Sequence, residues 1–464
     1  MTCAAVWMSL AMVLVQQLHS VVVEANLVDT FTWVESSTSL PKPLSDMTAT
    51  YMNGKGGSDT NGFIILFGGC DSPNGNQRDK SQSQMQFYCL SVTNSTFLYD
   101  PYQNSVTKVK DAPNPRYRHV AVSFNEEIYM LGGRDLADNF VTAIDVSNAN
   151  YNCLHSDDFF VWFKEKTFHF TPFFTMKVYN PYNDSWTTRG HLPSEIVTSD
   201  AVGWSTNDFI YYAGGYDVNY TAKGDTFRLD VSNNPTNFTE MAYKALSSMN
   251  IPRGDFSAEV AYGAYAYIVG GTSDVTGYCE SMKEVERYDI ASNKWDVIAP
   301  LNNGVDDSAV AFLRGKIITV GGETKVWDCL NITDPAYGAV PDNAVEALDA
   351  SLNNSTTKTT WNVYSDFPFT LMRFDAVAVP PQGRIYTFGG QKPYDETCQC
   401  FPAVSSILYG TESFSSAPQP SSQLSSGAIA GISIAAIIGA GIIIFGGYLF
   451  WKKSRMDKEY SSSD

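Results

Sequence analysis

Phe63-Ile64-Ile65-Leu66-Phe67-Gly68-Gly69 decides the fold of this chain, because the same pattern returns five more times. Each copy is a short run of β-branched and aromatic residues that ends in two glycines, and such runs are typical of buried strands. Strands that recur at a long interval indicate a repeat architecture, and this pattern predicts a β-propeller. The six glycine pairs are Gly68-Gly69, Gly132-Gly133, Gly214-Gly215, Gly270-Gly271, Gly321-Gly322 and Gly389-Gly390.

Each repeat predicts four strands. A variable loop follows the double glycine, and a third strand then ends near a tyrosine or leucine: Tyr99, Tyr179, Leu229, Tyr288, Leu348 and Tyr409. After a turn, the fourth strand begins at Val106 in the first repeat and at an aromatic residue in the next four: Trp186, Phe238, Trp295 and Trp361. The second repeat also contains an aromatic insertion, 140–174, which could pack against a blade or form an exposed contact.

The two ends of the repeat region complete one another. The sixth repeat has no fourth strand, whereas Thr30-Phe31-Thr32-Trp33-Val34 stands at the start with no strands before it. Pairing this N-terminal strand with the sixth repeat would cover an open strand edge. The sequence therefore predicts an all-β fold over residues 26–412, a propeller of six four-stranded blades closed by the N-terminal strand.

The order of double glycine, tyrosine and tryptophan resembles the kelch motif. The fourth repeat matches it best, with Gly270-Gly271, Tyr288 and Trp295. The resemblance covers residues 26–412 and implies a propeller of four-stranded blades. It implies no particular chemistry, because kelch-like propellers include adhesion modules, scaffolds and a few enzymes.

The composition limits the possible partners. The 464-residue chain has a formal net charge of −18, which argues against binding to nucleic acid or to an anionic membrane surface, since both require basic patches. The same charge also fits a solvated exterior that keeps the protein soluble.

Both ends of the chain suggest a single-pass type I membrane protein in the plasma membrane or an endomembrane. We expect a cleaved signal peptide, a serine-containing stalk, an uncharged apolar span followed by Lys452, Lys453 and Arg455, and a cytoplasmic tail. Gly427 and Gly431 within the span could allow two helices to pack as a homodimer. The expected segments are 1–25, 413–426, 427–451 and 452–464.

Sequons and cysteines agree with a secreted-type domain. Seven asparagines begin N-x-S/T sequons: Asn94, Asn183, Asn219, Asn237, Asn331, Asn353 and Asn354. Most of the cysteines that follow the expected signal should form disulfides, and Cys70 and Cys89 could staple one loop. Cys398 and Cys400 share the last such loop, but the spacing leaves the connectivity open.

Charged residues recur at the start of the innermost strands. The predicted ring of carboxylates comprises Asp46, Asp200, Asp255, Asp307 and Asp375, and the second repeat carries Arg118 at this place. Two residues earlier stand Arg116, Arg253 and Arg373. The aspartates could bind a polar ligand or a cation, or they could accept hydrogen bonds from turns and pair with the arginines. The arginines are the better candidates for a ligand.

The binding surface is expected at the propeller mouth, where the loops after the double glycines meet the junctions between blades. These loops carry aromatic side chains suited to binding, namely Tyr216, Tyr278, Trp327 and Tyr394. Glycans at Asn219 and Asn331 would shield the third and fifth blades. We expect a membrane-anchored extracellular recognition or adhesion module for a protein or glycan partner.

The alternative is an extracellular enzyme, either a galactose-oxidase-like propeller or a sugar epimerase. The resemblance implies that the oxidases hold copper with histidines and tyrosines, whereas the histidines that follow the expected signal are scattered without ligand spacing: His119, His155, His169 and His191. We expect no catalytic residues, no cofactor and no metal site.

Overall fold

The computed structural model describes twelve segments, and every structural statement below concerns them: 27–53, 62–78, 87–125, 127–137, 143–148, 178–179, 186–193, 195–231, 242–274, 280–325, 339–350 and 360–416. The chain divides into two units. Asp29–Ser413 contains the blades of the fold, and the other unit comprises Met1–Val28 and Phe414–Asp464.

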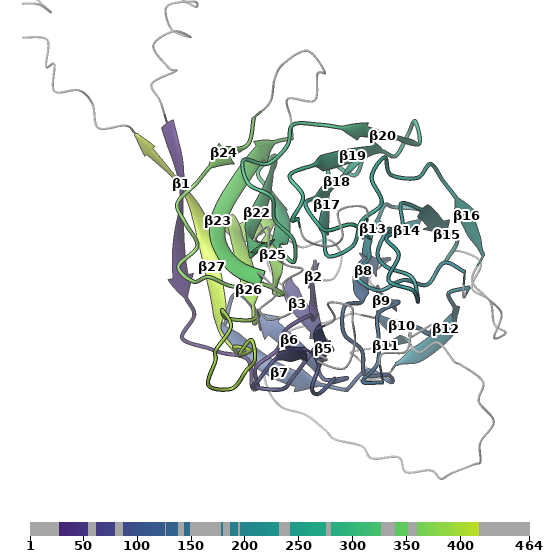
Figure 1. The fold of residues 1–464 in the computed structure, drawn as a ribbon, viewed down its shortest axis with the longest axis horizontal. Coiled ribbons are helices and arrows are strands. Elements are labelled where there is room, and N and C mark those ends of the chain that lie inside the picture. Colours follow the sequence, from purple (N-terminus) through teal and green to yellow (C-terminus); the bar gives the residue numbers. More distant parts are fainter. Residues whose placement is uncertain are drawn as a thin grey trace, which may run out of the picture. The chain divides into compact units, whose positions relative to one another are not determined.

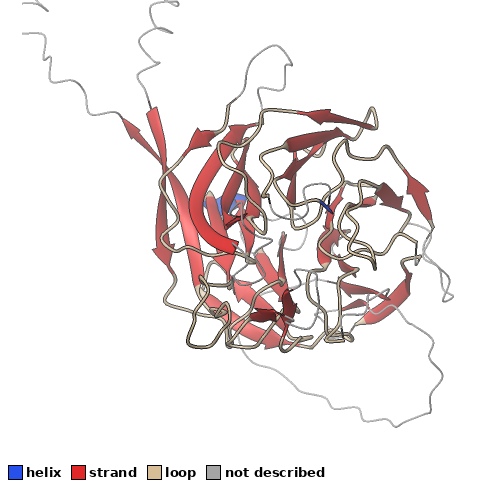
Figure 2. Ribbon diagram, in the orientation of Figure 1, coloured by secondary structure: helices blue, strands red, loops and turns tan. Residues whose placement is uncertain are grey.

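Five antiparallel sheets are four-stranded blades, each with its strands ordered from the inside outward (Figures 1 and 2). The first repeat contributes β2 (Thr48–Met52), β3 (Phe63–Phe67), β6 (Thr96–Asp100) and β7 (Ser105–Val109). The third contributes β13 (Val202–Ser205), β14 (Ile210–Ala213), β15 (Thr226–Leu229) and β16 (Tyr243–Ala245). The fourth contributes β17 (Ser257–Ala261), β18 (Tyr265–Val269), β19 (Val285–Asp289) and β20 (Lys294–Val297). The fifth contributes β21 (Ala309–Leu313), β22 (Lys316–Lys325), β23 (Ala339–Asp349) and β24 (Asn362–Val363). The sixth contributes β25 (Asp375–Val379), β26 (Arg384–Phe388), β27 (Ile407–Ser416) and β1 (Leu27–Glu35).

The second repeat departs from this plan, so the predicted count of six four-stranded blades is wrong. Its sheet has five described strands: β8 (Val120–Phe124), β9 (Glu127–Leu131), β10 (Ala143–Asn148), β11 (Val178–Tyr179) and β12 (Thr187–His191). The third position belongs to β10, not to a strand ending at Tyr179, and β10 pairs with β11 in parallel and with β12 in antiparallel fashion. The predicted insertion, 140–174, therefore contains β10, and the rest of it lies outside the described residues.

The N-terminal strand closes the ring as predicted, because β1 lies next to β27 at the outer edge of the sixth blade. Ser36 N–H donates to the Ile407 carbonyl oxygen at 2.8 Å and extends this contact. Phe31 on β1 is buried in the core cluster between the fifth and sixth blades. Pairing and burial together tie the two ends of the repeat region to one another.

The hydrophobic core lies between neighbouring sheets. Between the third and fourth blades, for example, Trp204 and Tyr211 pack with Tyr288 and Trp295. The Tyr288 and Trp295 ring centroids lie 4.9 Å apart, and Trp295 Nε1–H donates to the Ser247 carbonyl oxygen at 2.8 Å. The kelch-like tyrosine and tryptophan therefore hold one blade against the blade before it.

The double glycines allow a close approach between blades. Gly270 has a φ of +66°, and a Cβ atom there would lie 2.1 Å from the Val305 carbonyl oxygen. Any other residue would clash with the chain entering the next blade. This steric requirement explains why a glycine follows the second strand of the blade.

The first repeat carries a small hairpin after its double glycine. β4 (Asn76–Arg78) pairs with β5 (Phe87–Cys89), and a disulfide joins Cys70 to Cys89. A second disulfide joins Cys398 to Cys400 in the loop of the sixth repeat. These two pairs resolve the connectivity for the cysteines of the described segments.

Among the described elements, the helical segment is a 3₁₀ turn, η3 (Pro380–Gln382). No helix in the described part of the chain has the length and apolar character needed to cross a bilayer. The expected signal peptide, stalk, span and tail, with Gly427 and Gly431, lie outside the described residues.

Candidate functional site at the channel mouth

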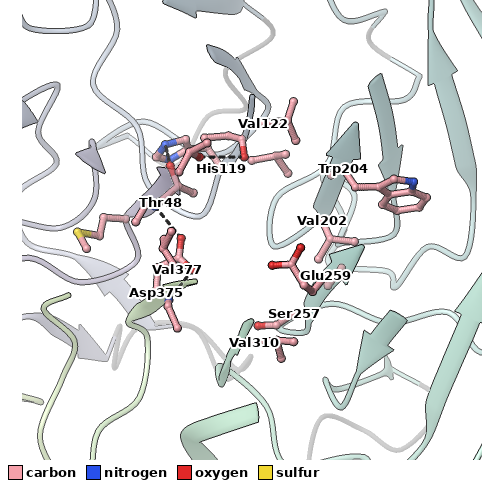
Figure 3. A pocket seen from close by; sticks show the side chains of 18 of the residues that line it. Thr48, His119, Val122, Val202, Trp204, Ser257, Glu259, Val310, Asp375 and Val377 are labelled. Atoms are coloured by element: carbon pink, nitrogen blue, oxygen red, sulfur yellow. Dashed lines mark hydrogen bonds between the residues drawn. The ribbon is translucent and has the colours of Figure 1, made fainter. Parts of the chain in front are cut away.

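The inner strands of the sheets surround a central channel with a volume of about 540 Å³. Its wall is formed by β2, β8, β13, β17, β21 and β25, which pack against one another around the axis. Figure 3 shows valine side chains together with Glu259 and Asp375 along this wall. The channel is therefore partly apolar, with carboxyl groups placed inside it.

Six residues with left-handed backbone conformation surround one mouth of the channel, and we call them the mouth ring: Asp46, Arg118, Asp200, Asp255, Asp307 and Arg373. Their φ values lie between +47° and +57°, a region that non-glycine residues seldom occupy. Each stands two residues before the first paired residue of an inner strand. The fold thus brings one charged side chain from every repeat to the same opening.

Backbone hydrogen bonds connect most of the mouth ring. The N–H of each of five members donates to the carbonyl oxygen of the preceding member, over 2.8–3.2 Å. No such bond joins Asp255 to Asp200 in the described structure. The ring is therefore continuous except at one junction.

The mouth ring corrects one predicted member. Asp375 pairs with Phe388 and is the first paired residue of its inner strand, as Val120 and Val202 are of theirs. The residue equivalent to Asp200 is therefore Arg373. The reason is that the turn between β25 and β26 is longer and contains η3. A residue at a fixed number of positions before the double glycine therefore lies two residues further along the chain than its equivalent in the second and third repeats. Four aspartates and two arginines, not five aspartates, make up the ring.

Arginines in the mouth ring bridge neighbouring carboxylates. Arg118 Nε lies 3.1 Å from Asp46 Oδ1, and its Nη1 lies 3.3 Å from Asp200 Oδ1. Arg373 Nε lies 2.8 Å from Asp307 Oδ2, and its Nη2 lies 3.9 Å from Glu323 Oε2. These contacts fix the guanidinium groups against the carboxylates on either side.

Asp200 and Asp255 meet at the junction where the backbone hydrogen bonds of the ring are interrupted. Their carboxyl groups lie within hydrogen-bonding reach of each other, yet Asp200 Oδ2 and Asp255 Oδ1 accept no hydrogen bond from a donor group in the described chain. Burial raises the pKa of Asp200. Burial also opposes ionisation of Asp255, but the charges of Lys325 and Arg118 outweigh it and lower the pKa of Asp255. These opposite pKa shifts favour a proton on Asp200 and an ionised Asp255.

Two of the predicted ligand-binding arginines lie in the protein interior. Arg116 and Arg253 are completely buried. Arg116 Nη1 donates to the Gly132 carbonyl oxygen at 3.2 Å, and Arg253 Nη2 lies 2.8 Å from Glu286 Oε1. The expectation that they face the mouth is wrong, because residues two before the mouth ring turn into the space between blades. Of the three, only Arg373 reaches the mouth.

The two predicted binding aromatics that the structure describes do not form an exposed surface. Tyr216 is buried, and its hydroxyl lies 3.0 Å from Asp255 Oδ2 and also contacts Thr272. It positions Asp255 instead of meeting a partner. Tyr394 is half-buried and packs edge-on against Phe401. Tyr278 and Trp327 lie outside the described residues.

The channel wall contains Glu259, which the sequence did not single out, together with Asp375 and His119. Burial raises the pKa of Glu259 to about 7, and it raises the pKa of Asp375 to about 6. Asp375 accepts hydrogen bonds from the N–H groups of Ala49, at 2.7 Å, and Ala376, at 2.8 Å, and so links the sixth repeat to the first. His119 Nε2 lies 2.9 Å from Thr48 Oγ1, and burial holds the pKa of His119 well below its usual value.

One acidic group beside the mouth has the spacing of a metal site. Asp306, Asp307 and Glu323 each offer a carboxylate oxygen within 4.8 Å of the others. Lys325 Nζ lies 2.7 Å from Asp306 Oδ2 and 3.2 Å from Glu323 Oε1. The chain's own ammonium group therefore supplies the positive charge in this cluster.

Two of the predicted glycosylation sites lie among the described residues. Asn219 is exposed in the loop after the third double glycine, on the side of the mouth. Asn94 is half-buried, and its amide donates to the Ala112 carbonyl oxygen at 2.7 Å. The other five sequons lie outside the described part: Asn183, Asn237, Asn331, Asn353 and Asn354.

Sequence comparisons relate the chain to proteins with kelch repeats. The Kelch motif model matches residues 260–302. Kelch-like protein 36 of Mus musculus is 25% identical over 300 residues, which cover 62% of this chain and 37% of that protein. Kelch-like protein 25 of Homo sapiens is 39% identical over 61 residues, or 12% of this chain and 10% of that protein.

Kelch-like protein 26 of Danio rerio is 22% identical over 237 residues, which cover 51% of this chain and 32% of that protein. The chain thus spans 37% or less of the length of these curated relatives. Together with the ring of antiparallel sheets, the motif match and these similarities support a kelch-repeat β-propeller.

Proposed function

We propose that this propeller is a recognition module that binds a protein or glycan partner at the mouth surrounded by the mouth ring. A kelch propeller fold is compatible with a protein-binding module. The observation that carries the proposal is the pair of Asp200 and Asp255 at the wall of the channel, because each has one carboxyl oxygen that accepts no hydrogen bond from another group of the described chain. Ionisable groups that are buried without full compensation are typical of functional sites.

Exposed apolar side chains on the same side as the mouth ring support this surface. Leu136, in the loop after the second double glycine, is 59% exposed. Phe369, in the segment that leads inward from β24 to Arg373, is 37% exposed. Apolar side chains around a polar centre suit contact with a macromolecule.

Replacing both exposed side chains tests the location of the binding surface. The Leu136→Lys/Phe369→Lys variant should lose at least about tenfold in capture on arrays of purified proteins and glycans, because each lysine removes an apolar contact. Tyr262→Lys is the matched control. Tyr262 is 58% exposed, but it lies at the turn between β17 and β18, at the far end of the inner strand from Asp255. Equal loss in both variants, or in neither, would contradict the proposal.

We further propose that the propeller lies outside the cytoplasm and is anchored by a helix over 427–451, with Gly427 and Gly431 available for pairing. The uncharged apolar stretch and the basic residues after it support this topology. Glycosidase treatment should shift the mobility of the full-length protein made in cells. An epitope placed after Asp464 should be labelled only after permeabilisation, and an unshifted protein labelled from outside would refute the topology.

A further inference from the structure

The mouth ring nearly alternates in charge. Around the channel, the order is Asp46, Arg118, Asp200, Asp255, Asp307 and Arg373. Strict alternation of aspartate and arginine would require an arginine at the place of Asp255. Two guanidinium groups are therefore present in the ring, and the position of a third is held by a carboxylate.

Three features distinguish the junction between Asp200 and Asp255 from the rest of the ring. Asp200 Oδ2 and Asp255 Oδ1 accept no hydrogen bond from any other group of the described chain, although Asp200 is only 8% exposed. The backbone hydrogen bonds of the ring are interrupted at this junction. Tyr216 and Thr272 hydroxyls hold the other oxygen of Asp255, at 3.0 and 3.1 Å, so that this carboxyl group has a fixed orientation. The open oxygens belong to groups that the structure holds in place.

We propose that the guanidinium group of an arginine side chain from a protein partner binds between Asp200 and Asp255 and completes the alternating ring. The inference rests on the proposed function and specifies the chemistry of the partner. Arg118 shows how such a group is accommodated in the ring, because its guanidinium contacts the two aspartates on either side at 3.1 and 3.3 Å. The channel volume of about 540 Å³ gives a side chain room to enter.

A divalent metal fits this position less well than a guanidinium group. Calcium requires six to eight oxygen ligands. In the described chain, the acidic group whose oxygens converge closely enough is Asp306, Asp307 and Glu323, and Lys325 already lies against it. A planar cation with several N–H donors matches two single oxygens on neighbouring carboxyls.

Binding of a cation at this place should release a proton. The raised pKa of Asp200 and the lowered pKa of Asp255 favour a proton on Asp200 while no cation lies between the two carboxyl groups. The charged and titratable groups around them come from every neighbouring repeat: Asp46, Arg118, Arg134, Tyr216, Asp307, Glu323, Lys325 and Arg373. An arriving guanidinium stabilises the doubly ionised pair, and the proton passes to solvent.

Calorimetric titration of the full-length protein tests the inference. The probe is the capped peptide Gly-Gly-Arg-Gly-Gly, and the matched peptide with neutral citrulline in place of arginine is the control ligand. At pH 7, in buffers of different ionisation enthalpy, the arginine peptide should bind with release of about one proton. Asp255→Asn should weaken binding roughly 10- to 100-fold, the range for a charge-assisted hydrogen bond. Asp296→Asn, at an exposed carboxylate of β20, should change nothing.

The outcomes separate this inference from the proposed function. Equal binding of the arginine and citrulline peptides, or binding unaffected by Asp255→Asn, would overturn the guanidinium site. Calcium binding that depends on Asp255 would replace it with a metal site. If Leu136→Lys/Phe369→Lys still abolishes capture of an array partner while Asp255→Asn does not, the mouth is the binding surface and only the arginine inference fails.

Discussion

Arg253 and Asp255 are two residues apart in the sequence, yet they belong to regions with opposite physical character. Arg253 lies between blades, where the chain supplies every contact that it needs. Its Nη1 donates to the carbonyl oxygens of Gly270 and Glu284 at 2.8 Å, and its Nη2 contacts Glu286. Asp255 lies in the mouth ring, where one carboxylate oxygen has no donor within the described chain. A buried charge with complete partners is structural, whereas an incompletely paired one marks a site for a ligand.

Glu286 shows how completely the interior arginine is integrated. Its carboxylate accepts from Arg253, from the backbone and side-chain nitrogens of Asn250, and from Ile251 N–H, over 2.7–3.0 Å. Burial lowers the pKa of Arg253, and the negative charge of Glu286 opposes this effect. The pair thus fixes the segment that leads from the third blade into the fourth.

The largest effect is expected from breaking the interior pair. Arg253→Ala leaves the carboxylate of Glu286 buried without its cation, which should lower the free energy of unfolding by about 3–5 kcal/mol. Urea denaturation of the full-length protein, followed by tryptophan fluorescence, measures the change. From the sequence, Arg116 and Arg253 were candidates for binding a ligand, whereas in the structure both are buried.

Asp296→Ala is the control for this comparison. Asp296 lies on the same blade and pairs with Arg287 at 3.3 Å, but its side chain is 57% exposed. An exposed ion pair contributes less than about 1 kcal/mol. If both variants lose the same stability, Arg253 is not distinguished by its burial and the contrast between the two regions fails.

Much of the fold could be predicted from the sequence, because the signals are local and repeated. The double glycines, the positions of Tyr288 and Trp295, and the unpaired strand around Trp33 report strand ends, blade contacts and closure. The second repeat was mispredicted because its spacing suggested a third strand at Tyr179, whereas β10 lies within the predicted insertion. Pairing between strands is a property of the folded chain that spacing alone does not reveal.

The site was harder to predict, because it depends on register and side-chain direction. Counting back from Gly389 placed Asp375 in the ring, but the turn Pro380–Gln382 adds residues to that hairpin. The Pro380-Pro381 dipeptide was the available signal for a longer turn. The burial of Arg253 had no such signal, because Arg253 and Asp255 turn to different surroundings where the backbone at Asp255 adopts a left-handed conformation. The burial of Tyr216 had none either, because it depends on a contact with Asp255 in the next repeat.

Glu259 allows a finer test, because it lies on the channel wall in β17, the strand that follows Asp255. Its Oε1 accepts from Val260 N–H at 2.9 Å, and no cation pairs with it among the ion pairs of the described chain. Burial raises its pKa from 4.5 to about 7. The folded state therefore holds a proton on Glu259 between these pH values, where the unfolded state releases it. Stability from this group is present below pH 4.5 and is lost as the pH rises toward 7.

Glu259→Gln should remove this pH dependence, because the amide stays neutral and can still accept from Val260. Between pH 5 and pH 8, the free energy of unfolding of the variant should rise by about 2 kcal/mol relative to that of the parent protein. This value is smaller than the full pKa shift would give, because the carboxyl group faces the channel. Urea midpoints at the two pH values measure this difference, with Glu286→Gln as the contrasting variant. Glu286 is paired with Arg253, so its loss should destabilise the protein at both pH values. If the difference in stability between Glu259→Gln and the parent protein is the same at both pH values, water or a counter-charge already compensates the charge of Glu259 on the channel wall.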